Sequence, residues 1–105
     1  MHNKEIIKGF SPVIILSILE QKAKYGYQIA QEIKEKSNKS LNFSEGTLYP
    51  LLHRLENEQM LTSFWQEVAG RKRKYYTLTL KGKKALSNQK KEWRSFSQTI
   101  SQVIN

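Results

Sequence analysis

The hydrophobic and polar positions between residues 44 and 57 follow the period of an α-helix. Four leucines fall at i, i+3, i+4 and i+7, which places them in one apolar stripe: Leu48, Leu51, Leu52 and Leu55. The opposite side carries small and hydrogen-bonding side chains with little charge: Gly46, Pro50, His53, Arg54 and Asn57, flanked by Thr47 and Tyr49. Such a face is slim and polar enough to enter the major groove of DNA and to read base edges. The alternative is an ordinary amphipathic helix whose solvent side is sparsely charged.

Pro50 lies inside this predicted helix, where proline removes one hydrogen bond and crowds the carbonyl group four residues back, that of Gly46. Two starts of the helix fit the sequence. Either Ser44 is the N-cap and the helix bends at Pro50, or the first regular turn begins at Thr47. The sequence leaves both open.

The residues before this stretch predict a short arm and two helices. Residues 4–10 form an arm with apolar side chains at helix-like spacing. Ser11-Pro12 is typical of an N-cap followed by proline at the first position of a new helix. That helix is apolar nearly all round as far as residue 19, so we expect a second subunit to cover one of its sides. The next helix opens at residues 25–27 and ends near residue 36.

Two strands are predicted after the helix of residues 44–57. Residues 62–68 and 74–79 are rich in Thr, Phe, Trp, Tyr and Val, so they read as two strands. Residues 69–73 join them as a loop with a turn glycine. Elsewhere, residues 41–43 fit a very short strand, and residues 22–24 read as a polar connection.

Four consecutive positive charges lie at or beside the tip of this predicted hairpin: Arg71, Lys72, Arg73 and Lys74. They belong to a wider excess, because ten of the 18 Lys and Arg residues lie between Gly70 and Arg94, with one acidic residue, Glu92. The net charge of +9 indicates a polyanionic partner, either nucleic acid or an anionic membrane surface. A solvated loop is the alternative for the tip. Its position after the candidate reading helix favours a finger that lies along a phosphate backbone.

A final helix is predicted from Thr79, its N-cap, towards Ile104. Its apolar residues follow an a/d heptad seam interrupted by Gln89: Leu86, Trp93, Phe96, Ile100 and Val103. Twenty-five residues at about 1.5 Å each give a rod of about 37 Å, which is more than the core of a domain this small can cover. We therefore expect the seam to pack on its twin in a symmetric dimer. A helix folded back on its own domain is the alternative.

Composition excludes several classes of protein. The 105 residues contain no cysteine, no aspartate and two histidines, so disulfides, thiolate chemistry, Ser-His-Asp sites and most metal sites are absent. We predict neither enzymatic activity nor a cofactor. The longest apolar run, residues 13–16, is far too short to span a bilayer. We therefore expect no membrane association, and a soluble, cytoplasmic protein.

Three helices, a two-stranded wing and a long helix form the order of a winged helix-turn-helix, a mainly α fold with a small β-hairpin (α+β). Within that order, the chain resembles the PadR family of transcriptional regulators from about residue 8 to residue 86. Four strings carry the resemblance: Tyr25-Gly26-Tyr27-Gln28-Ile29, Gly46-Thr47-Leu48-Tyr49-Pro50-Leu51-Leu52-His53-Arg54-Leu55-Glu56, Gly70-Arg71-Lys72-Arg73-Lys74-Tyr75-Tyr76 and Leu78-Thr79-Leu80-Lys81-Gly82.

The resemblance implies a DNA-binding domain over residues 1–79 and a dimerisation helix over residues 80–105. It implies a recognition helix over residues 44–57, a wing over residues 71–74, and a homodimer made by the first and last helices. The dimerisation residues are then Ile14, Ile18, Leu86, Trp93, Phe96, Ile100 and Val103. At Gln59 the family usually has a glycine that ends the recognition helix in a left-handed turn, so we expect a differently shaped terminus here.

The resulting hypothesis is a homodimeric repressor that binds an inverted-repeat operator in double-stranded DNA. Four residues of the recognition helix are the candidates for contacts with base edges and nearby phosphates: Thr47, Tyr49, His53 and Arg54. Ser44 and Tyr27 are assigned to phosphate positioning, and the wing residues to backbone attraction. A winged helix whose main partner is a protein or a structured RNA is the alternative.

The single C-terminal helix resembles a smaller subgroup of the family that includes multidrug-resistance regulators. In that subgroup a tryptophan at the position of Trp93 lines a pore between subunits and holds flat aromatic compounds. The resemblance therefore implies a small aromatic effector at Trp93 and Phe96. The alternative is that Trp93 packs against its twin without a ligand.

Overall fold

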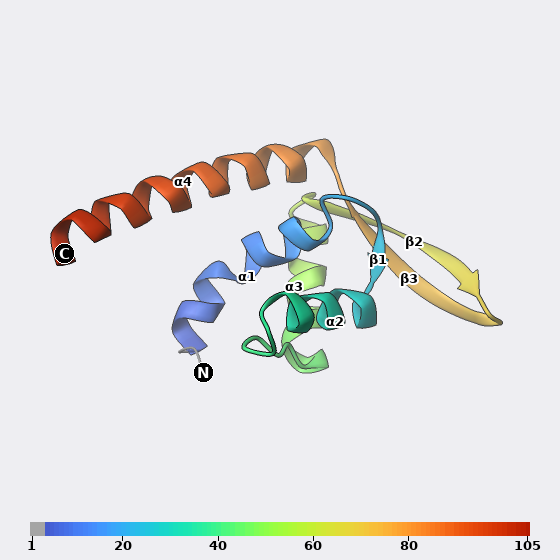
Figure 1. The fold of residues 1–105 in the computed structure, drawn as a ribbon. Helices are drawn as coiled ribbons and strands as arrows, with labels where there is room; N and C mark the ends of the chain where they lie inside the picture. Colours follow the sequence, from blue (N-terminus) through green and yellow to red (C-terminus); the bar gives the residue numbers. More distant parts are fainter. Residues whose placement is uncertain (1–3) are drawn as a thin grey trace.

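Four helices and three strands follow one another in residues 4–105, the part of the chain that the computed structural model describes. In chain order they are α1 (Lys4–Ile18), β1 (Lys24–Tyr25), α2 (Gly26–Lys36), α3 (Glu45–Asn57), β2 (Leu61–Val68), β3 (Arg71–Leu78) and α4 (Leu80–Ile104). The fold is mainly α with a small antiparallel sheet, which confirms the predicted class. The hairpin of β2 and β3 extends from one end of the molecule, and α4 extends from the other (Figure 1).

The sheet has β3 in the middle, paired antiparallel with both β1 and β2. The two-residue turn Ala69-Gly70 joins β2 to β3 and has φ values of 52° and 78°, the positive φ that tight hairpin turns require. The loop predicted over residues 69–73 is therefore too long. Residues 71–73 belong to β3, so their side chains alternate between the two faces of the sheet.

β1 was not predicted, because residues 22–24 read as a polar connection. Lys24 is nevertheless buried. Its Nζ donates to the carbonyl oxygen of Ile18 at 2.6 Å and forms an ion pair with Glu32 at 3.0 Å. A buried ammonium group is tolerated when it is paired and hydrogen-bonded in this way. Lys24 also pairs with Tyr76 across the sheet, which fixes the start of α2 against β3.

α1 runs through Pro12 without a break, so the arm and the separate helix predicted here are one helix. Ser11 is not an N-cap: its buried hydroxyl donates to the carbonyl oxygen of Ile7, one turn back, at 2.6 Å. Proline removes a hydrogen bond from a helix interior and crowds the preceding turn. The change of direction of α1 in Figure 1 is the expected consequence.

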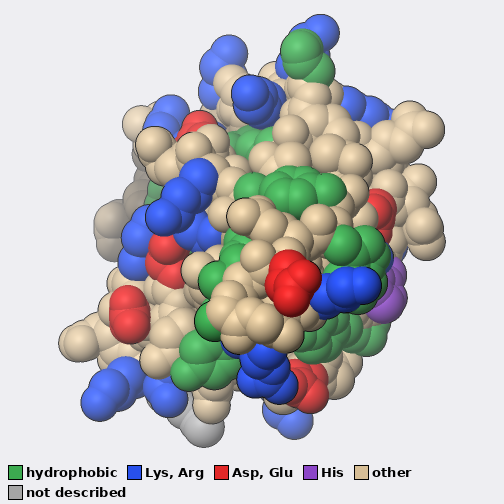
Figure 2. All heavy atoms as spheres, turned by 90° about the vertical axis from the view of Figure 1, so that its right-hand side faces the viewer, with side chains coloured by type: hydrophobic (Ala, Val, Ile, Leu, Met, Phe, Trp, Pro, Cys, Tyr) green, Lys and Arg blue, Asp and Glu red, His purple; other side chains and the backbone are tan. Residues whose placement is uncertain are grey.

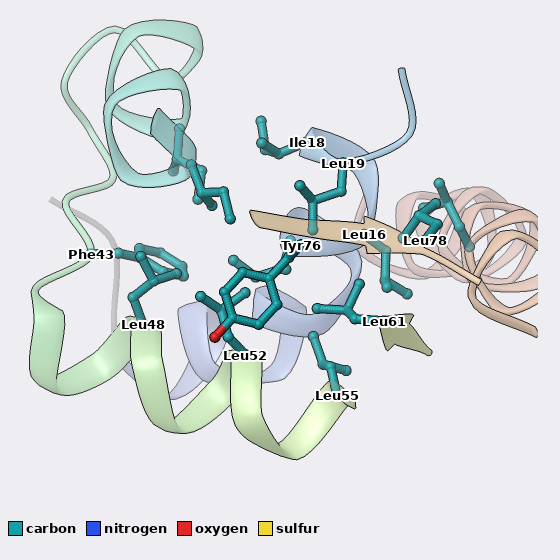
Figure 3. Packing of buried hydrophobic residues seen from close by; sticks show 14 residues of the cluster. Leu16, Ile18, Leu19, Phe43, Leu48, Leu52, Leu55, Leu61, Tyr76 and Leu78 are labelled. Atoms are coloured by element: carbon teal, nitrogen blue, oxygen red, sulfur yellow. The ribbon is translucent and has the colours of Figure 1, made fainter. Parts of the chain in front are cut away.

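The core lies where α1, α2 and α3 meet the sheet, and Tyr76 of β3 lies among its leucines, with its ring beside Leu52 of α3 (Figure 3). Phe43 packs into this core from the connection between α2 and α3. The strand predicted over residues 41–43 is absent. The buried apolar residues are Ile15, Leu16, Ile18, Leu19, Ile29, Ile33, Phe43, Leu48, Leu52, Leu55, Leu61, Tyr76, Leu78 and Leu86.

α4 packs on this core only near its start. Leu86 is 1% exposed and Ile18 is 6% exposed, so both contribute to the core of their own chain. Their assignment to a dimer seam is therefore corrected. Further along α4, Lys90 forms an ion pair with Glu20 at 3.1 Å, and beyond it most side chains are exposed.

Candidate nucleic-acid interface

A groove of about 770 Å³ separates the wing from the start of α2 and the outer face of α3. It brings together several residues that the sequence assigned to DNA: Tyr27, Tyr49, His53, Arg71, Lys72, Arg73 and Lys74. Figure 2 views this wing end of the molecule and shows Lys and Arg side chains around exposed hydrophobic ones, with a smaller number of acidic side chains among them. Positive charge and apolar surface are therefore interleaved on one face, a combination typical of nucleic-acid-binding surfaces.

α3 begins directly after Ser44, because the backbone N–H groups of Thr47 and Leu48 donate to the Ser44 carbonyl oxygen at 3.1 and 2.8 Å. Of the two starts left open, the earlier one is observed, with Pro50 inside the helix. The Ser44 hydroxyl donates to Thr47 Oγ1 at 3.1 Å rather than capping the helix backbone.

The outer face of α3 exposes the four residues assigned to base reading: Thr47, Tyr49, His53 and Arg54. Tyr49 and His53 line the groove. Thr47 and Arg54 lie on the same helix outside the groove lining, and Arg54 forms an ion pair with Glu58 at 3.6 Å on the surface. The structure therefore places all four on one element and brings two of them against the wing.

Tyr49 also has a packing role that the sequence did not indicate. Its hydroxyl lies so close to Gly26 that a Cβ at residue 26 would be 2.6 Å from the Tyr49 oxygen. Gly26 is the first residue of α2, so the Tyr49 ring sets the separation of α2 and α3. Part of this side chain remains exposed, at 38%.

The four basic residues of the wing differ in what they contact. Arg73 lies over the ring of Tyr25, with its guanidinium carbon 4.3 Å from the ring centroid. Lys74 lies 3.5 Å from a carboxylate oxygen of Glu56 and 5.5 Å from the Tyr76 ring centroid. Arg71 and Lys72, nearest the turn, are exposed.

Glu56 connects α3 to the wing. One carboxylate oxygen pairs with Lys74 of β3, and the other accepts a short hydrogen bond from the Ser63 hydroxyl of β2. Tyr76 lies beside this cluster, and its burial raises the pKa of its phenol. Sequence reasoning assigned Lys74 wholly to DNA and gave Glu56 no role, although the two residues hold α3 and the hairpin in one orientation.

α3 ends in a left-handed turn at Gln59, with φ of 64°. The N–H of Met60 donates to the Leu55 carbonyl oxygen at 2.9 Å, and the N–H of Gln59 to that of Glu56 at 2.9 Å, which is the Schellman pattern. The expectation of a differently shaped terminus is wrong, because glutamine adopts here the conformation that glycine would accept more cheaply.

The same terminus is fixed to the start of α4. The Thr79 hydroxyl donates to the carbonyl oxygens of Gln59 and Met60 at 2.6 and 3.2 Å and accepts from the N–H of Gly82 at 3.0 Å. Thr79 is therefore the N-cap of α4, as predicted. Lys81 Nζ also donates to the Glu58 carbonyl oxygen at 3.0 Å. These hydrogen bonds hold the C-terminal end of α3 against the start of α4.

Trp65 of β2 is a residue of this face that sequence reasoning missed. It lines the groove opposite α3 and is 67% exposed. The available signal was strand alternation: Trp65 pairs with Lys74 across the hairpin, so both side chains belong to the face that carries Glu67 and Lys72.

A second, largely apolar groove of about 540 Å³ lies between α1 and the middle of α4. Its lining includes Ile6, Phe10 and Ile14 from α1 and Trp93 from α4. Trp93 is 51% exposed, and the apolar stripe continues along exposed α4 through Phe96, Ile100 and Val103. These residues remain available to a partner, unlike Leu86 and Ile18.

A helix, α3, with an exposed hydrogen-bonding face, a basic hairpin beside it and a groove between them are the features of a DNA-binding winged helix-turn-helix protein. Within residues 4–105, none of the helices combines the length and the apolar character needed to cross a membrane.

The comparisons with known proteins agree with this class. Residues 15–88 match the transcriptional regulator PadR-like family, so the chain belongs to that family of transcriptional regulators, which are not enzymes. The chain is 34% identical to the transcriptional regulator Rv3488 of Mycobacterium tuberculosis over 76 aligned residues. The alignment covers 72% of this chain and 68% of that protein.

Two solved structures extend the comparison. A transcriptional regulator from Clostridium thermocellum superposes with a TM-score of 0.89 at 30% identity, over 97% of this chain and 100% of that chain. Bacillus subtilis PadR in complex with operator DNA gives a TM-score of 0.68 at 28% identity, over 75% of this chain and 45% of that longer chain.

Proposed function

We propose that this protein is a homodimeric repressor that binds an inverted-repeat operator in double-stranded DNA. The observation that supports this best is the groove between α3 and the wing, which gathers Tyr27, His53, Arg71 and Lys72 on one cationic face. The structural likeness to a PadR protein in complex with operator DNA favours duplex DNA over a protein or an RNA partner. Since chromosomal DNA is the proposed partner, we also propose a cytoplasmic location.

The proposed division of labour follows the geometry. α3 enters the major groove, where His53 and Arg54 reach base edges and Thr47 reaches a base edge or the adjacent phosphate. Tyr27 and Ser44, both exposed, position phosphates beside the start of each helix. In the wing, Arg71 and Lys72 supply most of the attraction, because Arg73 and Lys74 already contact Tyr25 and Glu56.

The homodimer is supported by apolar surface that one chain leaves exposed. The groove of α1 and the stripe Trp93, Phe96, Ile100 and Val103 face solvent in the single chain. Twofold pairing through α1 and α4 would remove this surface from water. In this proposal residues 1–79 bind DNA, and residues 80–105 pair the subunits once the first turns of α4 have packed on the core.

The experiment has two arms. Sedimentation measures the mass of the wild type and of an Ile100→Glu variant, which should dissociate the dimer without touching the core. Footprinting on DNA upstream of the protein's own gene then identifies a protected inverted repeat, with half-sites about 34–36 Å apart. A monomeric wild type that binds RNA or random duplex as tightly as any palindrome would overturn the proposal.

Release by a small aromatic effector is part of the proposal. Trp93 is half exposed, and Phe96 lies nearly one turn further along the same helix, so two subunits would present four rings to one space. A flat apolar compound fits between such rings. Quenching of Trp93 fluorescence by planar aromatics in a Trp65→Phe background tests this, and an unchanged emission would favour Trp93 packing on its twin.

A further inference from the structure

Trp65 lies in the wing next to two lysines, and its position is unusual for so large an apolar side chain. Of the hairpin aromatics, Tyr76 is buried, and the ring of Phe64 stacks on Tyr75 with centroids 5.6 Å apart. Trp65 belongs to neither arrangement within the described residues and is 67% exposed. Exposed indole surface is unfavourable in water, so its place is explained if a partner covers it.

Trp65 and Lys72 both line two hollows. One is the groove of about 770 Å³ that faces α3, and the other is a hollow of about 500 Å³ on the hairpin that also includes Gln66 and Glu67. The two residues therefore form the boundary between the hollows. In the smaller hollow the carboxylate of Glu67 offsets the charge of Lys72, whereas the larger hollow is lined by four basic residues and one carboxylate, Glu45. The excess of positive charge in the larger hollow therefore favours a phosphate there over the smaller one.

The DNA backbone that separates a major groove from the next minor groove must pass between α3 and the wing, if both bind the duplex as proposed above. That backbone alternates charged phosphates with apolar deoxyribose rings. The groove offers the same two kinds of surface, because Trp65 lies directly opposite Lys74 and diagonal to Lys72 on one face of the hairpin. Its indole N–H can also donate a hydrogen bond to a phosphate oxygen.

We propose that Trp65 is a DNA-contacting residue that packs its indole against a deoxyribose of the backbone lying in this groove, with Lys72 on the adjacent phosphate. This inference rests on the proposed DNA-binding function and adds a contact that is neither ionic nor sequence-specific. Because no counterion is released when an indole is covered, the contact strengthens binding without changing its salt dependence.

The test compares Trp65→Ala, Trp65→Phe and Lys72→Ala in the full chain, on operator and on random duplex over a range of salt. Trp65→Ala should weaken both duplexes alike, on the order of tenfold, from the apolar area that is no longer covered. Its slope of log affinity against log salt should match the wild type, and Trp65→Phe should restore part of the loss. Lys72→Ala should instead reduce the slope by about 0.9 for each subunit's lost phosphate.

A spectroscopic measurement separates contact from stability. With 5-fluorotryptophan in the wild type, the fluorine resonance of Trp65 should shift when duplex is added, and that of Trp93 at the other end of the molecule is the internal control. Wild-type affinity for DNA in Trp65→Ala, or a salt slope lowered as in Lys72→Ala, would overturn the inference and leave the proposed function intact. A wild type that binds no duplex would overturn both.

Discussion

The ring of Tyr49 lies against the backbone of Gly26, where a side chain on residue 26 would have to go. A Cβ there would be 2.6 Å from the Tyr49 hydroxyl oxygen and 2.9 Å from Cζ, closer than van der Waals contact allows. Space rather than backbone conformation therefore limits this position, because the Tyr49 side chain must move before residue 26 can carry a Cβ. The contact connects the first residue of α2 with the exposed face of α3, the two helices of the helix-turn-helix.

Gly26→Ala should consequently displace the Tyr49 ring. We expect a loss of about 1–3 kcal/mol in unfolding free energy, typical of overpacking, and weaker operator binding. In a Tyr49→Ala background the same change should cost little, because the space is free. A double-mutant cycle by urea denaturation measures this coupling. Additive effects of the two substitutions would show that the ring does not limit residue 26.

The sequence predicted elements that have a long regular period and missed those that depend on distant partners. The apolar stripe of α3 and the extent of α4 could be predicted from the spacing of apolar residues alone. β1 has two residues and no period, and the burial of Lys24 depends on Glu32, which lies on α2. Ser11-Pro12 wrongly predicted the start of a new helix, because the Ser11 hydroxyl donates to a carbonyl oxygen one turn back in the same helix instead of capping a new one.

The same limit applies to the candidate site. The residue types of α3 and the basic run identified the face, but composition could not show that Lys74 is paired with Glu56. The heptad pattern marked Leu86 as apolar and could not reveal which chain covers it. Trp65 was overlooked because its neighbour Phe64 is equally apolar, and only the register of the hairpin separates their two faces.

Gln59 ends α3 with φ of 64°, a conformation that costs a glutamine about 1 kcal/mol and glycine almost nothing. Gln59→Gly should therefore raise the unfolding free energy by about 0.5–1 kcal/mol, measured by chemical denaturation. Glu58→Gly is the control, because residue 58 has φ of −81° and gains nothing from glycine. A destabilised Gln59→Gly would contradict the argument.

Gly82 begins the packing of α4 on the end of α3. A Cβ at this position would overlap the carbonyl oxygen of Met60, a backbone atom that cannot rotate away. We expect Gly82→Ala to reduce the unfolding free energy by about 3 kcal/mol or more, because the joint must open. Gly9→Ala in α1 is the matched control: its Cβ meets nothing within 4 Å, so helix propensity should stabilise it by up to about 1 kcal/mol.

Glu32 provides a prediction about pH. Burial alone would raise the pKa of its carboxyl, but hydrogen bonds and charge from Lys24 and Lys36 outweigh burial, so the pKa is lowered. A lowered pKa in the folded state means that the carboxylate stabilises the protein fully above its unfolded pKa of about 4.3, and that this contribution is lost as pH falls through the folded value.

Glu32→Gln should therefore lower the unfolding free energy at pH 7, by about 1–3 kcal/mol, because Lys24 loses the partner of a buried charge. The difference between the variant and the wild type should shrink as pH falls below the unfolded pKa of about 4.3 and disappear once pH is below the lowered pKa of the folded state. Thermal melts at several pH values measure the difference. Glu35→Gln, which removes an exposed carboxylate from the same helix, is the control and should change the unfolding free energy little.

Arg54 and Lys72 allow base reading to be separated from charge attraction. Arg54 is exposed on the recognition helix, where its ion pair with Glu58 at 3.6 Å is weak enough to exchange for DNA. If its guanidinium reads a guanine, Arg54→Ala should reduce discrimination between operator and random duplex by about 1–3 kcal/mol. Lys72→Ala should weaken both duplexes equally. Competition binding at two salt concentrations measures each effect, and an equal loss on both duplexes for both variants would remove Arg54 as a reader.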